Sequence, residues 1–206
     1  MKFGVQPFHI AVQDYAIINS VISLARATLR DFPDIYALQE ENLVTNLAPD
    51  ARSDGFVTTP FTLQLMGELR GDDSFLVARD DESGALAGYV FMGSWAFCAR
   101  WPAFRVAIAR FPLHWGERVI EVERTFQYGP VCVAARFRGQ GVLPILFKGV
   151  KREMRPHFEA GTTWINKANG RSMNAHTQKL GLVPLDEFDL NDNRFILLAF
   201  ETGMNE

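Results

Sequence analysis

Short apolar runs separated by polar turns fill the chain from residue 74 onward. Their lengths and their β-branched and aromatic content are typical of strands. Strands are predicted at 74–79, 85–95, 119–122, 126–134, 162–166, 185–190 and 195–200. After residue 142 the period changes, because Leu143, Leu146, Phe147, Val150 and Met154 recur at the spacing of a helix face. This alternation predicts a mixed α/β fold.

The first third of the chain reads mainly as helix. Apolar residues at helical spacing predict a helix that Asp14 caps, that passes through Leu29 and that Pro33 stops. A final helix would be capped by Asn169 and closed by Gly181 in the left-handed conformation. This final helix spans 170–180. The remaining predicted elements are a strand at 7–12 and helices at 34–48, 59–69 and 103–110.

The composition is typical of one domain with a sizeable core. The chain has 206 residues, of which 48% are hydrophobic and 22% are charged. We expect a single domain over residues 1–206, with its core at about 74–200 and a helical N-terminal part at 1–73. No apolar run reaches the roughly 20 residues of a membrane helix, and the start lacks a signal-peptide core. A cytoplasmic protein that contacts no membrane is therefore expected, with Cys98 and Cys132 as reduced thiols.

Charge is unevenly distributed along the chain. Residues 136–179 contain nine Lys or Arg and two Glu, although the net charge of the whole chain is −3. The remainder carries 12 basic and 22 acidic residues. The basic block predicts either an anionic ligand or a solvated helix face. Nucleic acid is disfavoured as a partner, because the chain is acidic overall and aromatic residues do not alternate with the basic ones.

The basic block begins at a glycine turn between a strand and a helix. The apolar run that ends at Ala134 is followed by Arg136, by Gly139-Gln140-Gly141 and then by the helical pattern. Glycines let the main chain approach a ligand, and the unpaired N–H groups of a helix N-terminus bind phosphate. Pro144 stands where a dinucleotide fingerprint needs its third glycine, and the Gly-Lys-Ser/Thr of a P-loop is missing.

The pattern Arg-x-x-Gly-x-Gly, formed by Arg136, Gly139 and Gly141, resembles the acetyl-CoA pyrophosphate loop of the GNAT superfamily of N-acetyltransferases. One strand further on, Asn169, Ser172 and the run Lys179-Leu-Gly-Leu182 resemble a second GNAT signature. The two signatures stand in the order and at the distance that the family shows. The resemblance covers roughly residues 74–200, and His176 stands where the family usually has tyrosine.

The resemblance implies a mostly antiparallel central sheet with splayed fourth and fifth strands and flanking helices. Gly129-Pro130, which predicts a bulge or bend, fits the fourth strand of that fold. The gap between the two strands would admit the pantetheine arm of acetyl-CoA beside exposed main chain. By this resemblance, the cofactor-binding residues are Val131, Cys132, Val133, Arg136, Arg138, Gly139, Gln140, Gly141, Val142, Leu143, Asn169 and Ser172.

The implied reaction is the attack of an amine on the acetyl thioester. A main-chain N–H near Val133 would bind the oxyanion, and His176 would protonate the leaving thiolate unless it only packs. Glu121 and Glu123 are candidate bases on one face of a strand, with a solvated strand face or a water relay as alternatives. Cys132 is expected to fill the core, because nothing in the sequence activates it. No metal site is expected.

We therefore expect an acetyl-CoA-dependent N-acetyltransferase that moves an acetyl group to a primary amine by direct attack in a ternary complex. The alternative is a GNAT-like module that binds CoA without catalysis. Both small amines and protein amines remain open as acceptors, and the acidic remainder of the chain favours a cationic one. The aromatic segment 96–118 is either core or a substrate-side lid, and a homodimer is left open.

Overall fold

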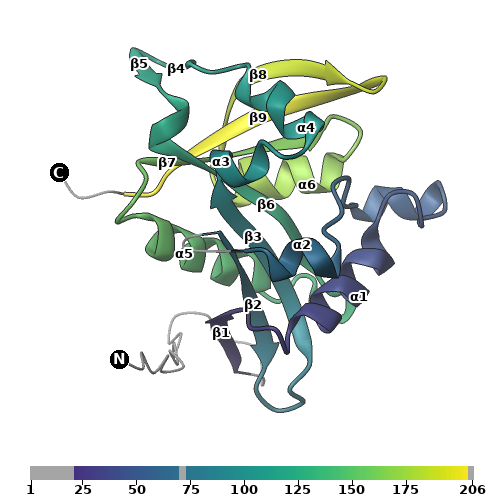
Figure 1. Cartoon of the computed structure of the whole chain (residues 1–206). Helices are drawn as coiled ribbons and strands as arrows, with labels where there is room; N and C mark the ends of the chain where they lie inside the picture. Colours follow the sequence, from purple (N-terminus) through teal and green to yellow (C-terminus); the bar gives the residue numbers. More distant parts are fainter. Residues whose placement is uncertain (1–20, 70–72, 204–206) are drawn as a thin grey trace.

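The computed structural model describes residues 21–69 and 73–203 (Figure 1). A seven-stranded sheet has the order β1-β2-β3-β6-β7-β9-β8. Every neighbouring pair is antiparallel except β6 and β7, which are parallel. Its strands are β1 (Ile22–Arg26), β2 (Ser74–Asp80), β3 (Leu86–Ser94), β6 (Thr125–Val133), β7 (Ala160–Asn166), β8 (Val183–Leu190) and β9 (Asn193–Glu201). The separate hairpin consists of β4 (Leu113–Trp115) and β5 (Arg118–Ile120).

Helices cover both faces of the sheet. They are α1 (Phe32–Asn42), α2 (Leu63–Gly67), α3 (Trp95–Cys98), α4 (Pro102–Ile108), α5 (Val142–Met154) and α6 (Gly170–Asn174). Short 3₁₀ turns occupy Asp50–Asp54, Val122–Arg124 and Ala135–Phe137, and a π-helical turn, Ala175–Lys179, continues α6. The expected mixed α/β fold with a mostly antiparallel sheet and flanking helices is confirmed.

Two hydrophobic cores result from the alternation of side chains along the strands. Leu76 of β2 packs with Leu146 and Val150 under α5, whereas the neighbouring Phe75 packs on the opposite face with Ile35 of α1. Each such fully buried side chain contributes about 1.5–3 kcal/mol relative to exposure. Figure 1 shows α5 on one side of the sheet and α1 with α2 on the other. This burial holds the N-terminal end of α5 next to the end of β6.

The helix expected to pass through Leu29 is wrong over residues 22–26. Residues Ile22–Arg26 form β1, which pairs antiparallel with β2. Ile22 and Leu24 are buried, but Val21 and Leu29 are 62% and 75% exposed, so the burial period is two. The start of that helix at Asp14 and the strand expected at 7–12 lie outside the described residues.

Pro33 begins a helix instead of stopping one. It lies in the first turn of α1, where its missing N–H is not needed. Asp31, just before the helix, accepts hydrogen bonds from the N–H and hydroxyl groups of Thr28 and also binds Arg79. The pKa of Asp31 is lowered by these bonds, although burial opposes the change. α1 ends at Asn42, well before residue 48.

Two other expected elements are shorter than the sequence suggested. α2 begins after Thr62, whose hydroxyl accepts the N–H of Leu65, and not at Thr59-Pro60. The strand expected at 119–122 ends at Ile120 as β5. The expected strands near 74–79, 85–95, 126–134, 162–166, 185–190 and 195–200 and the helix at 103–110 are confirmed within a few residues. No helix in the described ranges is long and apolar enough to cross a membrane.

Candidate functional site

The sheet opens between β6 and β7. Only three residue pairs join these strands, from Thr125↔Ala160 to Gln127↔Thr162. Beyond them β6 continues to Val133 beside β3, and β7 continues to Asn166 beside β9, without pairing to each other. The expected splaying of these two strands is confirmed, and it leaves main-chain groups of β6 without a strand partner on that side.

A bulge on β6 lies where the opening begins. Tyr128 pairs with Met92 and Val131 with Val90, so Gly129 and Pro130 together stand opposite one residue of β3. Gly129 has a φ of +92°, which a residue with a Cβ rarely adopts, and Pro130 has no N–H to donate. This confirms the expected bulge.

Main-chain groups of Val131 and Val133 face the opening. Ala134 donates its N–H to the carbonyl of Ala87, next to the end of β3. Main-chain groups in an antiparallel pair point alternately toward and away from the partner strand. The groups of Cys132 therefore point to β3, and those of Val131 and Val133 point away from it. The carbonyl of Val133 accepts a hydrogen bond from Arg138 Nε at 3.1 Å, so of the two main-chain groups of Val133 only the N–H remains for a ligand.

The glycine loop offers further unpaired donors. Gly139 and Gly141 have φ values of +79° and +81°, and Gly141 is the residue just before α5. Within the described chain, the N–H groups of Gly139, Gly141, Val142 and Leu143 have no hydrogen-bond partner. Such a cluster at a helix N-terminus is suited to a phosphate group.

A pocket of about 330 Å³ joins the loop to the opening. Its wall carries three basic side chains, Arg138, Arg171 and Lys179, and no carboxylate from the described residues. Nine of the twelve expected cofactor residues line it: Val131, Cys132, Val133, Arg138, Gly139, Gly141, Val142, Leu143 and Ser172. Arg136 and Gln140 belong to the same loop but lie outside this lining, and Asn169 lines a second, smaller pocket.

The Cys132 thiol is buried against α1 and is a poor nucleophile. The residue is 6% exposed, and its sulfur lies 4.0 Å from the carbonyl oxygen of Leu38 in α1. Burial raises the pKa of Cys132 to about 12, so the reactive thiolate is scarce at neutral pH. Cys98 is also a free, buried thiol.

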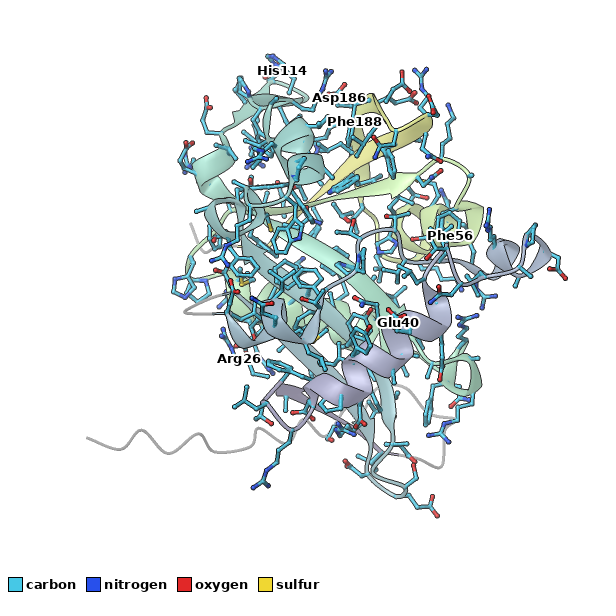
Figure 2. All side chains as sticks on the ribbon, turned by 45° about the vertical axis from the view of Figure 1, so that its right-hand side comes forward. Arg26, Glu40, Phe56, His114, Asp186 and Phe188 are labelled. Atoms are coloured by element: carbon cyan, nitrogen blue, oxygen red, sulfur yellow. The ribbon has the colours of Figure 1, made fainter. Side chains whose placement is uncertain are left out.

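Asn169 ties the loop that follows α1 to α6. Its Oδ1 accepts the N–H of Ser172 as a helix cap, as the sequence predicted, and its Nδ2 donates to the carbonyl of Phe56 at 3.0 Å. Figure 2 shows Phe56 on this loop. Phe56 and Val57 line both pockets, yet nothing in the sequence marks them as functional. They are placed there by long-range hydrogen bonds, from Asn169 to Phe56 and between Val57 and the residues at the end of α1.

The smaller pocket, of about 70 Å³, adjoins the larger one, and the two share Phe56, Val57, Val131, Ser172 and His176. Phe104 and Trp164 form an aromatic wall, with ring centroids 5.4 Å apart. Phe104 is the member of the aromatic segment 96–118 that reaches this pocket. Trp95, Phe97 and Cys98 nearby are buried in the core, which favours the core interpretation for most of that segment.

His176 lies at the junction of the two pockets and is 3% exposed. Its Nδ1 is 2.7 Å from the carbonyl oxygen of Ser172, and its ring packs edge-on against Tyr128 at 5.7 Å. A carbonyl only accepts, so Nδ1 carries the proton and Nε2 of the neutral ring is a hydrogen-bond acceptor. Burial lowers the pKa of His176, and the bond to Ser172 offsets this only in part. The ring is therefore neutral at pH 7.

Glu121 and Glu123 lie away from both pockets. Both are exposed, and the 3₁₀ turn at Val122–Arg124 replaces the strand on which they were expected to share a face. The expected shared strand face is therefore wrong, because the turn at Val122–Arg124 comes before β6 begins. Neither glutamate is among the residues that line the pockets. Among the described residues, no group of three or more His, Cys, Asp and Glu could hold a metal ion.

The seven-stranded sheet that parts beside a bulged strand, followed by a glycine loop and helix, defines the GNAT fold. Solved structures with this fold match most of the chain. An N-acetyltransferase from Staphylococcus aureus Mu50 is 15% identical, with 88% of this chain and 98% of that one aligned and a TM-score of 0.57. A GNAT-family acetyltransferase from Streptococcus pneumoniae is 13% identical over 87% and 99%, with a TM-score of 0.53.

The protein yncA from Salmonella typhimurium, solved with its cofactor acetyl-CoA, is 14% identical over 90% of this chain and 95% of that one, with a TM-score of 0.55. No family model and no curated protein sequence matches the chain. At these identities the likeness establishes the fold, and the activity has to be argued from the site.

Proposed function

We propose that this protein transfers an acetyl group from acetyl-CoA to a primary amine by direct attack in a ternary complex. One observation supports this above all: a cationic cleft with unpaired main-chain donors meets an uncharged pocket at a single histidine. The cleft suits the acidic donor substrate, the pocket suits an amine, and His176 lies where the two would meet.

The larger pocket offers each part of acetyl-CoA a matching group. The N–H groups of Gly139, Gly141, Val142 and Leu143 would hold the pyrophosphate. Arg171 and Lys179 would add positive charge beside it. The carbonyl of Val131 and the N–H of Val133 would bind the amides of the pantetheine arm, as a strand added at the open edge of β6. Ser172 would contact the arm from α6.

Next, the reaction needs a proton acceptor and an oxyanion site. The nitrogen lone pair of the amine attacks the thioester carbon, and the carbonyl π electrons move onto oxygen, where the N–H of Val131, which lines both pockets, would stabilise the charge. Nε2 of His176 takes one proton from the amine nitrogen. The tetrahedral centre then expels the CoA thiolate and leaves the amide, and the imidazolium returns its proton to the sulfur.

This role differs from that of an acid alone. Because Ser172 holds the proton on Nδ1, Nε2 of the resting ring has no proton to donate. His176 must first act as a base, and only then can it act as an acid. An imidazolium whose pKa is lowered by burial is a stronger acid than a free one, which suits the second step.

A covalent acetyl-enzyme has no support in the site. The buried Cys132 has a pKa of about 12, and its main-chain groups pair with β3 instead of facing the proposed arm-binding edge. Direct transfer therefore predicts intersecting lines in initial-velocity plots when both substrates are varied. Parallel lines would instead indicate an acetylated enzyme.

The decisive assay measures CoA release and amide formation together, with acetyl-CoA and a panel of primary amines. Amine-dependent formation of both products in equal amounts supports the proposal. Tight CoA binding by calorimetry with no product from any amine would contradict it and would favour a module that binds CoA without catalysis. Gly141→Ala should weaken CoA binding, because φ at this position is +81°, and product formation should fall with it.

A further inference from the structure

We infer that the acceptor is a small primary amine carried by an uncharged apolar group, either alkyl or aryl-alkyl. This inference rests on the proposed function and names the substrate class of the same site. It departs from the expectation of a cationic acceptor, because no acidic residue in the described part of the chain lines the smaller pocket.

The lining of the smaller pocket contains no fixed charge. None of its 16 residues, all from the described chain, is Asp, Glu, Lys or Arg. Its one titratable side chain, His176, is neutral at pH 7 because burial lowers its pKa. A second ammonium or a carboxylate on the acceptor would lose water here and find no opposite charge, which is strongly disfavoured.

The amide N–H groups of the pocket already donate within the protein, whereas Gln127 Oε1 has no hydrogen-bond partner in the described chain. Asn166 donates to the side chain of Asn193 and accepts the N–H of Ala168. Asn169 caps α6 and donates to Phe56, and the amide N–H groups of Gln127 donate to main-chain carbonyls of β6. These amides therefore have few N–H donors left for a carboxylate on the acceptor.

The apolar wall fixes the shape that the acceptor can have. Trp164 is held between three rings, with centroids 5.4 Å from Phe104, 5.0 Å from Phe195 and 5.7 Å from Phe188. The pocket of about 70 Å³ has room for about two water molecules, each of which occupies roughly 30 Å³. A short alkyl chain fits a space of that order, an aryl-alkyl group would place only part of its ring there, and both bury apolar surface against Trp164.

An uncharged pocket also prepares the amine for attack. Burial disfavours the ammonium form and lowers the pKa of an amine. The nucleophile would then enter as the free base, whose one surplus proton passes to Nε2 of His176 after attack. No carboxylate is required for that step, which agrees with the distance of Glu121 and Glu123 from the pocket.

The experiment compares amines that differ in one group. Butylamine, 1,4-diaminobutane and 4-aminobutanoate have the same four-carbon chain. Butylamine carries no second charge, 1,4-diaminobutane carries a second ammonium, and 4-aminobutanoate carries a carboxylate. We expect kcat/KM for butylamine and for 2-phenylethylamine to exceed those of the other two by about 30-fold or more. Equal or better use of the diamine or the amino acid would overturn the inference while leaving acetyl transfer intact.

A charge placed at the pocket rim provides the second test. Thr58 lines the pocket but is exposed, so substitutions there leave the core undisturbed. Thr58→Asp should raise the kcat/KM ratio of 1,4-diaminobutane to butylamine by about 3- to 10-fold, and the neutral Thr58→Asn should leave that ratio unchanged. An unchanged ratio in the Asp variant would contradict the inference. Failure of every amine in the wild type would refute the proposed function itself, and this inference with it.

Discussion

Replacing His176 by asparagine distinguishes the roles of the two imidazole nitrogens. An asparagine amide at this position can still donate to the carbonyl of Ser172, as Nδ1 does at 2.7 Å, but it offers nothing at the position of Nε2. The loss of a positioned proton acceptor reduces turnover by about 10²- to 10⁴-fold, a rise in the barrier of roughly 3–5 kcal/mol. CoA affinity should change little, because the unpaired N–H groups of the glycine loop are untouched.

The pH profile ties the effect to this residue. Burial lowers the pKa of His176 below its ordinary value of 6.5, so the neutral base form predominates above that pH. In the wild type, kcat/KM should fall as the pH falls through the lowered pKa, and His176→Asn should lack this acid limb. The unfolded chain binds the proton more readily, so wild-type stability should also decrease below about pH 6.5, and the variant should lack that contribution.

The assay follows thiol release from acetyl-CoA with butylamine between pH 5 and pH 8, beside CoA binding by calorimetry. Tyr128→Phe is the matched control, because the buried Tyr128 hydroxyl has no hydrogen-bond partner in the described chain and its ring would still support His176. Wild-type turnover in His176→Asn with intact CoA binding would refute the assignment. An acid limb that persists in the variant would refute it equally.

Three further predictions concern the loop, the thiol and the packing of α5. Gly141→Ala should weaken CoA binding, measured by calorimetry, by about 5-fold or more, because alanine at this φ costs roughly 1 kcal/mol of backbone strain. Gly170→Ala is the control and should leave CoA binding unchanged, because Gly170 has an ordinary φ and open space around it. Native Cys132 should resist maleimide until the protein unfolds, and Cys132→Ala should keep most of its turnover, with loss of activity indicating a covalent role. Gly149→Ala should destabilise the fold by about 1–3 kcal/mol in urea unfolding, because the new Cβ would lie 2.3 Å from Leu24; an unchanged midpoint would contradict the packing described.

The sequence predicts the parts of the site that depend on local backbone requirements. Gly139 and Gly141 adopt positive φ at the predicted turn, and Gly129-Pro130 forms the predicted bulge. Asn169 caps α6, and Gly181 has a φ of +75° where a left-handed residue was expected. Each of these follows from what one or two residues permit, and the neighbours in space hardly matter.

The remaining elements depend on contacts that a single sequence does not reveal. The five residues of β1 are too few to distinguish a period of two from the period of a helix, so pairing with β2 decides their structure. Pro33 is compatible with both the end and the start of a helix, and the bonds of Asp31 select the start. The smaller pocket joins Phe56, Phe104 and Trp164 from distant parts of the chain, and only the folded sheet brings them together.

A crystal structure with CoA bound would show whether the glycine loop and the opening between β6 and β7 form the CoA site. The pyrophosphate is expected within hydrogen-bond distance of the N–H groups of Gly139, Gly141 and Val142, and the pantetheine arm between β6 and β7, with its sulfur close to Val131 and His176. A structure in which CoA binds elsewhere and residues 138–143 contact no phosphate would contradict this assignment.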